Sequence, residues 1–270
     1  MRSNALAARQ YDQDVSAARS APPASERREA LKEVLAQARA CQRCSELAAT
    51  RKTVVFGAGN ADAELMFIGE APGASEDEQG LPFVGQAGKL LDQLLAEIGM
   101  ERRDVFVANV LKCRPPGNRD PLPSEIENCQ DYLLRQVELI QPSVICTLGN
   151  FSTKLLRGDS TGITRLHGQP EVITLGRRAV RLYPIYHPAA ALYTPRMLDT
   201  LREDFLRLPE LLALGPPEQP PAEAFEAREL AETAAEPAGE SDAAGEPMNS
   251  GAPDPAAEER SQEPDQLGLF

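Results

Sequence analysis

The chain has 270 residues, 42% of them hydrophobic and 26% charged, which is enough to bury the core of one large domain or two small ones. It contains no run of 18 or more apolar residues, so we expect no membrane span, and its first residues carry no apolar segment of signal-peptide length. The formal net charge of −13 would disfavour binding to nucleic acid if it were spread evenly along the chain.

The acidity, however, is concentrated at the C-terminal end. Residues 215–270 contain 14 acidic and 2 basic residues, whereas residues 1–214 contain 27 acidic and 26 basic ones. The first 214 residues are therefore close to neutral, and a local basic groove on them is compatible with the composition.

The chain begins with a polar segment and then a helix. Residues 1–25 are small and polar, which predicts a flexible leader. Apolar residues at helical spacing then predict a helix over 26–39, and this helix leads directly into the sequence Cys41-Gln42-Arg43-Cys44.

The middle of the chain alternates short apolar runs with amphipathic stretches. The apolar runs predict strands at 64–69, 105–110, 143–149 and 181–186. The amphipathic stretches predict helices at 87–98, 123–140, 150–156 and 198–212. Near-continuous apolar strands that alternate with helices are typical of a parallel sheet covered on both faces. We therefore expect an α/β fold of three layers, α/β/α, with a four-stranded parallel central sheet.

Unusual residues lie at or just after the carboxyl ends of these predicted strands. They are the glycine-containing segment 69–73, Asn109, Gly149 and the pair His187-Pro188. In open α/β sheets ligands bind at this edge, so we expect the functional site there.

Five cysteines in a protein that we expect to be cytoplasmic indicate a metal site or a catalytic thiol rather than disulfides. Cys41 and Cys44 form a C-x2-C pair. Cys113 lies just beyond a predicted strand, and Cys129 lies near the start of a predicted helix. Spacing alone fits a four-cysteine zinc site and an iron–sulfur cluster equally well. Cys146 lies inside an apolar run and is interpreted as a buried core residue.

Three sequence blocks and the four cysteines together carry a family resemblance. The blocks are G-E-A-P-G-A-S-E-D-E-Q-G-L-P-F-V-G-Q-A-G-K-L-L-D at 69–92, N-V-L-K-C-R-P-P-G-N-R-D-P at 109–121 and H-P-A-A-A-L at 187–192. Over residues 35–208 the chain resembles the family 4 uracil-DNA glycosylases. The resemblance implies a glycosylase domain over 26–212, a four-stranded parallel sheet between helices, and a structural [4Fe-4S] cluster on Cys41, Cys44, Cys113 and Cys129.

The resemblance also implies an activity: hydrolysis of the N-glycosidic bond of flipped-out uracil in DNA, the first step of base excision repair. In that family pattern Phe83 stacks on the base, Asn109 reads its Watson–Crick edge, and His187 donates a hydrogen bond to O2 as negative charge develops. Taken singly, Phe83 is more typical of a core residue, and an asparagine at a strand end such as Asn109 is often only a turn residue. The implied protein is a monomer, associated with the nucleoid, whose partner is uracil-containing DNA.

Further site residues follow from the same comparison. Ala71, Pro72 and Gly73 line the floor of the predicted pocket, and Glu76, with Asp77 as the second candidate, excludes the methyl group of thymine. Family 1 enzymes position the attacking water with an aspartate where this chain has Ala71. We therefore expect Glu70 or Asn118 to position the water, although Glu70 is also compatible with a scaffold role.

Contacts with DNA are expected on both sides of the pocket. Arg114, Arg119 and Arg196 are candidate phosphate ligands. The segment after His187, with Ala189, Ala190 and Leu192, is the candidate wedge that fills the gap left by the flipped base.

The C-terminal segment has the composition of a disordered linker. Residues 213–265 are rich in Pro, Glu, Ala and Gly. The chain ends in an apolar cluster that resembles the peptides that bind the bacterial sliding clamp, with Gln266, Leu267, Leu269 and Phe270 as the contacting residues. An acidic tether of this kind would raise the local concentration of the enzyme at the clamp.

Two other functions remain open at this point. One is an X-type binding protein that traps uracil-DNA covalently through a histidine in an inserted K-R-R-I-H-like loop, but residues 114–119 hold no histidine. The other is an iron–sulfur or zinc module without catalysis, which leaves Phe83, Asn109 and His187 without a common purpose. A glycosylase with broader substrate scope is also compatible with the sequence.

Overall fold

A computed structural model describes residues 22–221 of the chain. Most of the predicted leader, most of the acidic linker and the clamp-binding-like peptide lie outside the described residues.

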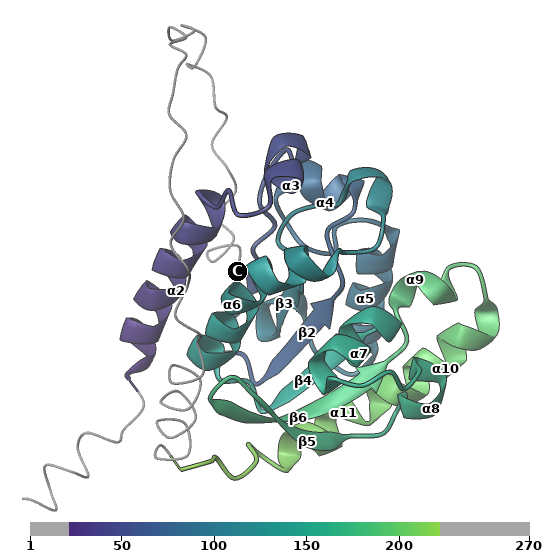
Figure 1. The fold of residues 1–270 in the computed structure, drawn as a ribbon. Coiled ribbons are helices and arrows are strands. Elements are labelled where there is room, and N and C mark those ends of the chain that lie inside the picture. Colours follow the sequence, from purple (N-terminus) through teal and green to yellow (C-terminus); the bar gives the residue numbers. More distant parts are fainter. Residues whose placement is uncertain (1–21, 222–270) are drawn as a thin grey trace, which may run out of the picture.

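A six-stranded sheet forms the centre of the described structure, in the order β1-β3-β2-β4-β6-β5 (Figure 1). The strands are β1 (Ala58–Gly59), β2 (Leu65–Gly69), β3 (Phe106–Asn109), β4 (Val144–Leu148), β5 (Glu171–Leu175) and β6 (Arg178–Ile185). The pairs β3–β2, β2–β4 and β4–β6 are parallel, which confirms the predicted four-stranded parallel centre. The prediction was incomplete at the edges, because β1 and β5 each add an antiparallel strand.

Both faces of the central strands are buried, which explains their near-continuous apolar sequence. Successive residues of β2 point to opposite faces, so that Met66 and Ile68 pack into one core and Leu65 and Phe67 into the other. The first core includes α2 and α6, and the second includes α5, α10 and α11. The three-layer α/β/α prediction is thereby confirmed.

The helices agree with the predicted ones in most places. They are α2 (Ala24–Arg39), α3 (Ser45–Thr50), α4 (Ala74–Gln79), α5 (Gln86–Glu97), α6 (Pro123–Ile140), α7 (Asn150–Arg157), α8 (Ile163–Leu166), α9 (Pro188–Ala191), α10 (Pro195–Leu206) and α11 (Leu208–Ala213), with 3-10 turns at Arg102–Asp104 and Pro116–Asn118. The helix predicted at 198–212 is divided into α10 and α11. Pro209 accounts for the break, because it has no N–H to donate and is tolerated only in the first turn of a helix.

Contacts with the domain continue beyond residue 212, where the sequence predicted that the linker begins. The side chain of Gln219 pairs with the main chain of Ala179 in β6: the N–H of Ala179 donates to Oε1 at 3.1 Å, and Nε2 donates to the carbonyl oxygen at 3.0 Å. Within residues 22–221, no helix is long and apolar enough to cross a membrane.

The parallel register brings the carboxyl ends of four strands to one edge of the sheet. Gly69 pairs with Asn109, and Leu148 pairs with Ile185, two residues before His187. The residues that the sequence placed at strand ends therefore meet at this edge.

Candidate active site and cysteine cluster

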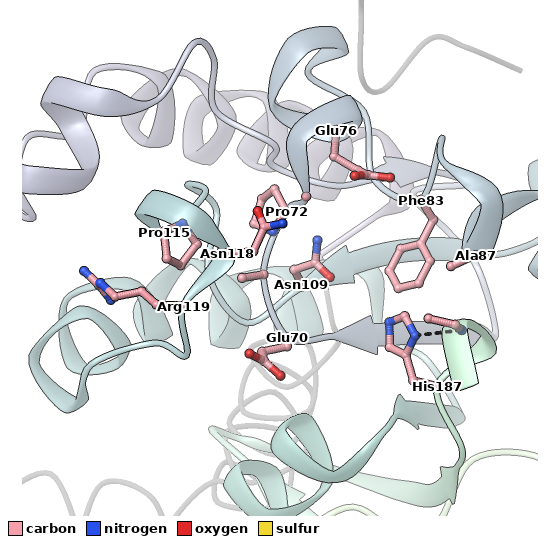
Figure 2. Close-up of a pocket in the computed structure, with 13 residues that line it drawn as sticks. Glu70, Pro72, Glu76, Phe83, Ala87, Asn109, Pro115, Asn118, Arg119 and His187 are labelled. Atoms are coloured by element: carbon pink, nitrogen blue, oxygen red, sulfur yellow. Dashed lines mark hydrogen bonds between the residues drawn. The ribbon is translucent and has the colours of Figure 1, made fainter. Parts of the chain in front are cut away.

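A cavity of about 440 Å³ opens at the carboxyl edge of the sheet (Figure 2). Its lining contains most of the predicted site residues: Glu70, Ala71, Pro72, Gly73, Glu76, Phe83, Asn109, Asn118, Arg119, His187 and Ala189, together with Ala87 and Pro115. The sequence blocks at 69–92, 109–121 and 187–192 thus converge on one cavity.

Phe83 enters the cavity from a strained backbone. Its φ of +55° is unusual for a bulky residue and costs on the order of 1–3 kcal/mol. Two neighbours make this conformation possible. Arg102 Nη2 donates to the Phe83 carbonyl oxygen at 2.7 Å. Gly88 leaves room for the same oxygen, because a Cβ at residue 88 would lie only 1.6 Å from it. The ring lies 5.5 Å from the imidazole of His187 at an interplanar angle of 26°. The ring packs at the border of the second core and also lines the cavity, and the strained backbone directs it there.

Asn109 ends β3 and is 2% exposed. Figure 2 shows its amide facing the ring of Phe83 across the cavity. Gly69, its partner on β2, provides the necessary space: a Cβ there would lie 2.4 Å from Asn109 Oδ1 and 2.8 Å from Phe83 Cζ. The amide and the ring therefore occupy their positions only because residue 69 has no side chain.

Replacing Gly69 by alanine should displace Asn109 and Phe83, because the added methyl group would overlap both side chains. We expect kcat/KM for the reaction catalysed in this cavity to fall at least about 10-fold. We also expect the free energy of unfolding to fall by ~1–3 kcal/mol. Steady-state kinetics and thermal unfolding measure the two effects. Gly162→Ala is the matched control, since its Cβ would meet only Asn150 Oδ1 at 3.9 Å. Equal activity of both variants would show that the contact at residue 69 has no importance for the site.

His187 directly precedes α9 as its N-cap residue and is held as a neutral donor. Its Nδ1 accepts a hydrogen bond from the Ala189 N–H at 3.1 Å, which assigns the ring proton to Nε2. Burial lowers the pKa of His187 to about 4, against the smaller opposing effect of the Glu76 carboxylate. The ring packs close to Gly149, where a Cβ would lie 3.1 Å from His187 Cβ. At neutral pH, His187 therefore presents an uncharged N–H.

Glu76 fixes the segment that follows Phe83. One oxygen, Oε1, accepts from the N–H groups of Val84 and Gly85, both at 3.0 Å. The carboxylate also lines the cavity, whereas Asp77 does not. Asp77 is buried and instead accepts from the N–H groups of Lys52 and Thr53 at 3.0 and 3.4 Å. The structure thus brings the first candidate for thymine exclusion to the site and leaves the second candidate outside it.

Glu70 and Asn118 occupy different environments in the cavity wall. Burial raises the pKa of Glu70, and the charge of Asp120 raises it further. Glu70 also lines an adjacent groove of about 640 Å³, which contains Asp120, Asn150, Phe151, Lys154 and His187. Asn118 has a positive φ of 56°, and its Oδ1 accepts from Arg114 Nε at 2.7 Å.

The predicted DNA contacts have mixed placements. Arg119 is engaged by carboxylates, with bonds of 2.9 and 2.6 Å to Glu125 and 2.9 Å to Glu46, so a phosphate would compete with these partners. Ala190 in α9, Leu192 directly after it and Arg196 in α10 are exposed, as a DNA-contacting segment requires. Sequence analysis missed Tyr193, which is 87% exposed, and missed Asn150 and Lys154 in the adjacent groove. The sequence did hold a signal for two of them: Tyr193 is an aromatic residue two positions before a proline, and Asn150 is a polar residue directly after the glycine that follows a strand.

The four predicted cysteine ligands line a second, enclosed cavity between α2, α3, the segment after β3 and α6. Three sulfurs accept hydrogen bonds: Cys113 from Arg51 Nη1 at 3.1 Å, Cys129 from the Lys112 N–H at 3.3 Å and Cys44 from Asn128 Nδ2 at 3.6 Å. Cys146 lies apart, fully buried in β4, as the sequence indicated.

Burial raises the pKa of the thiols of Cys44 and Cys113, and that of Cys129 to about 11. Burial also acts to raise the pKa of Cys41, but hydrogen bonds with Tyr132 and Arg43 lower it overall. Within the described ranges, no three Cys, His, Asp or Glu side chains converge in the geometry of a single metal ion. Four cysteine sulfurs around one enclosed cavity, three of which accept N–H bonds, fit the ligand set of a thiolate-bound iron–sulfur cluster.

Comparisons with known proteins agree with this geometry. The family model of the uracil DNA glycosylase superfamily matches residues 56–208. A type-4 uracil-DNA glycosylase of Archaeoglobus fulgidus is 45% identical over 187 residues, which cover 68% of this chain and 94% of that protein. The type-4 enzyme of Saccharolobus solfataricus is 47% identical over 185 residues, covering 67% and 85%. The resemblance inferred from the sequence is confirmed, and the chain belongs to the uracil DNA glycosylase superfamily and, within it, to the type-4 uracil-DNA glycosylases.

Proposed function

We propose that this protein is a uracil-DNA glycosylase that hydrolyses the N-glycosidic bond of flipped-out uracil in DNA and so begins base excision repair. One observation carries the proposal: an aromatic ring, a buried amide and a neutral imidazole N–H, from Phe83, Asn109 and His187, meet in one cavity at the carboxyl edge of the sheet. An enzyme that acts on an extruded base needs a stacking surface, an edge reader and a donor to the leaving group.

Each of the three side chains has a defined part in this reaction. The ring of Phe83 stacks on the flipped base. The amide of Asn109 donates to O4 and accepts from N3–H, a pattern that cytosine cannot match because it presents an amino group and an unprotonated N3. His187 Nε2–H donates to O2, where negative charge develops as the N1–C1′ bond breaks and its electron pair passes to the uracil ring.

Glu76 is proposed to exclude thymine, since its carboxylate lines the cavity beside Gly73 and is held by the N–H groups of Val84 and Gly85. A fixed carboxylate at C5 would leave no room for a methyl group. Ala71, Pro72 and Gly73 would form the floor of the pocket.

Glu70 is proposed to position the attacking water. It lines both the cavity and the adjacent groove, whereas Asn118 Oδ1 already accepts from Arg114. The water oxygen forms the new bond to C1′ and releases a proton, for which a carboxylate of raised pKa is a better acceptor than an amide.

The cysteine cavity is proposed to hold a [4Fe-4S] cluster on Cys41, Cys44, Cys113 and Cys129. The four cysteines around one cavity and the three N–H···S contacts support this assignment. When bound, the cluster would act as a structural cross-link. The residues themselves tie the end of α2, the segment after β3 and α6 to one another.

Purified protein is expected to contain four iron and four sulfide per chain, as the proposed cluster requires, with visible absorbance that Cys129→Ser reduces. Cys146→Ser is the matched control, because Cys146 is buried in β4 away from the cavity. Elemental analysis that finds one zinc and no iron would contradict the cluster assignment.

DNA would be gripped by Arg114 and Arg196 and by the segment after His187, which is proposed to insert Leu192 beside Ala189 and Ala190. Tyr193, which follows directly and is 87% exposed, adds an aromatic surface for unpaired bases. We propose that the enzyme acts as a monomer at the nucleoid.

The C-terminal residues Gln266, Leu267, Leu269 and Phe270 are proposed to bind the sliding clamp. Deleting 266–270 is expected to abolish clamp binding, measured by surface plasmon resonance. Excision from short oligonucleotides should remain unchanged, since the peptide lies outside the glycosylase domain. Clamp binding that persists after the deletion would show that the apolar terminus is unrelated to the clamp.

The proposed function is tested by measuring free uracil released from an oligonucleotide with one uracil. Multiple turnovers, with no release of base from the matching thymine and cytosine oligonucleotides, are expected. A stable protein–DNA adduct without turnover would support the X-type trap instead. If neither free uracil nor an adduct forms, both the glycosylase function and the X-type trap are contradicted.

A further inference from the structure

Lys112 is a buried ionisable residue that lies between the uracil cavity and the cysteine cluster. It is 1% exposed and directly precedes Cys113. It does not line the uracil cavity, although it contributes to the wall of the cysteine cavity. The proposed reaction assigns it no role.

The side chain of Lys112 fixes the end of β3. Its Nζ donates to the carbonyl oxygen of Asn109 at 2.8 Å and to Gln136 Oε1 at 2.6 Å. Gln136 is fully buried, and its Nε2 donates to the Phe56 carbonyl at 2.9 Å. The ammonium group also lies 5.9 Å from the ring centroid of Phe56. The main chain that carries the Asn109 amide is therefore anchored by a buried cation.

The main chain of Lys112 contacts the cluster from the same position. Its N–H donates to Cys129 Sγ at 3.3 Å, and its carbonyl accepts from the Val55 N–H at 2.8 Å. Cys129 and Gln136 both lie on α6, seven residues apart, so they share one face of that helix. Lys112 thus contacts Cys129 through its main-chain N–H and Gln136, on the same face of α6, through its side chain.

Burying a charge raises the free energy of the folded state, so an apolar residue of similar length would be more stable here if packing were its only role. The main-chain N–H of Lys112 contacts Cys129 Sγ, so thiolates on the four cysteines would place negative charge beside the same residue. On the basis of the proposed function, we propose that Lys112 is a positioning residue that couples the two sites. Its ammonium holds the Asn109 main chain for uracil reading and supplies positive charge to the sulfur ligands.

Lys112→Met is the principal test, because it keeps the length of the side chain and removes both the charge and the donor. We expect full iron content, at least a 10-fold weaker inhibition by free uracil, and a lower reduction potential of the cluster. The potential falls because a lost positive charge disfavours the added electron. Lys52→Met is the matched control, since Lys52 is 62% exposed and pairs with Glu78, and it should change neither quantity.

Gln136→Leu separates position from charge, because it keeps the ammonium and removes one of its anchors. We expect weaker inhibition by uracil with little change in potential, and this variant decides the matter if Lys112→Met loses iron. Unchanged uracil inhibition in Gln136→Leu, or an iron-replete Lys112→Met with unchanged inhibition and potential, overturns the proposal. Wild-type protein that releases no uracil would instead contradict the proposed function.

Discussion

Replacing His187 by alanine is expected to lower kcat for uracil excision about 100- to 1,000-fold, the usual effect of removing one preorganised donor to a developing oxyanion. The structure holds His187 as a neutral Nε2–H donor through the Ala189 N–H. Phe83 and Asn109 remain in the variant, so KM and inhibition by free uracil should change much less than kcat. Single-turnover kinetics on a one-uracil oligonucleotide separate these quantities.

The control for this variant is His167→Gln. His167 is the other histidine of the chain, and it contacts Asp204 and Tyr186 outside the cavity. Its replacement should leave kcat within a few-fold of the wild-type value. A His187→Ala enzyme that is equally active would remove the imidazole from the reaction.

The same histidine has a consequence for pH dependence. Its pKa of about 4 lies below the ordinary value of 6.5, so His187 stays neutral through the physiological range and should add no inflection near pH 6.5 to the rate profile. The folded protein binds fewer protons at this site than the unfolded chain. The free energy of unfolding should therefore fall as pH drops from about 6.5 to 4, and this component should be missing in His187→Ala.

Replacing Asn109 by aspartate is expected to have the second large effect. The amide is 2% exposed and faces the base site, and an ionised carboxylate there can accept from N3–H but cannot donate to O4. We expect kcat/KM for uracil to fall at least about 100-fold, since a site built to hydrogen-bond a substrate group is strongly affected when the match is lost. Selectivity should shift toward cytosine, measured on paired uracil and cytosine oligonucleotides.

Asn60→Asp is the matched control, because Asn60 is exposed, lies outside the uracil cavity, and uses its Oδ1 only to accept from the Asp62 N–H at 2.9 Å, as a carboxylate also can. It should retain the wild-type preference for uracil over cytosine. Unaltered preference in Asn109→Asp would assign the reading of the base edge to another residue.

The centre of the fold could be predicted because its strands are buried on both faces. Apolar runs such as 144–148 are then nearly continuous, and their alternation with helices leaves few other arrangements. The edge strands gave weaker signals. β1 has only two residues, and β5 is partly or fully exposed at every position, so neither resembles the central strands.

Candidate site residues could be located because parallel strands bring their carboxyl ends together, and Asn109 and His187 each follow an apolar run. The functions of individual side chains depend on contacts between distant segments. Arg119, a predicted phosphate ligand, is an example, because its carboxylate partners Glu46 and Glu125 compete with a phosphate for the guanidinium group. The left-handed backbone of Phe83 depends likewise on Arg102 and Gly88, and sequence spacing does not reveal such pairings.

Strand cleavage on end-labelled DNA with a single uracil, followed by alkali, tests the central claim most directly. The account predicts one product at the uracil position with wild-type protein and none from the matching thymine DNA. It also predicts that the product forms about 100- to 1,000-fold more slowly in His187→Ala. Cleavage at thymine as well as uracil, or equal rates in both proteins, would contradict the claim that this cavity selects uracil and stabilises its anion through His187.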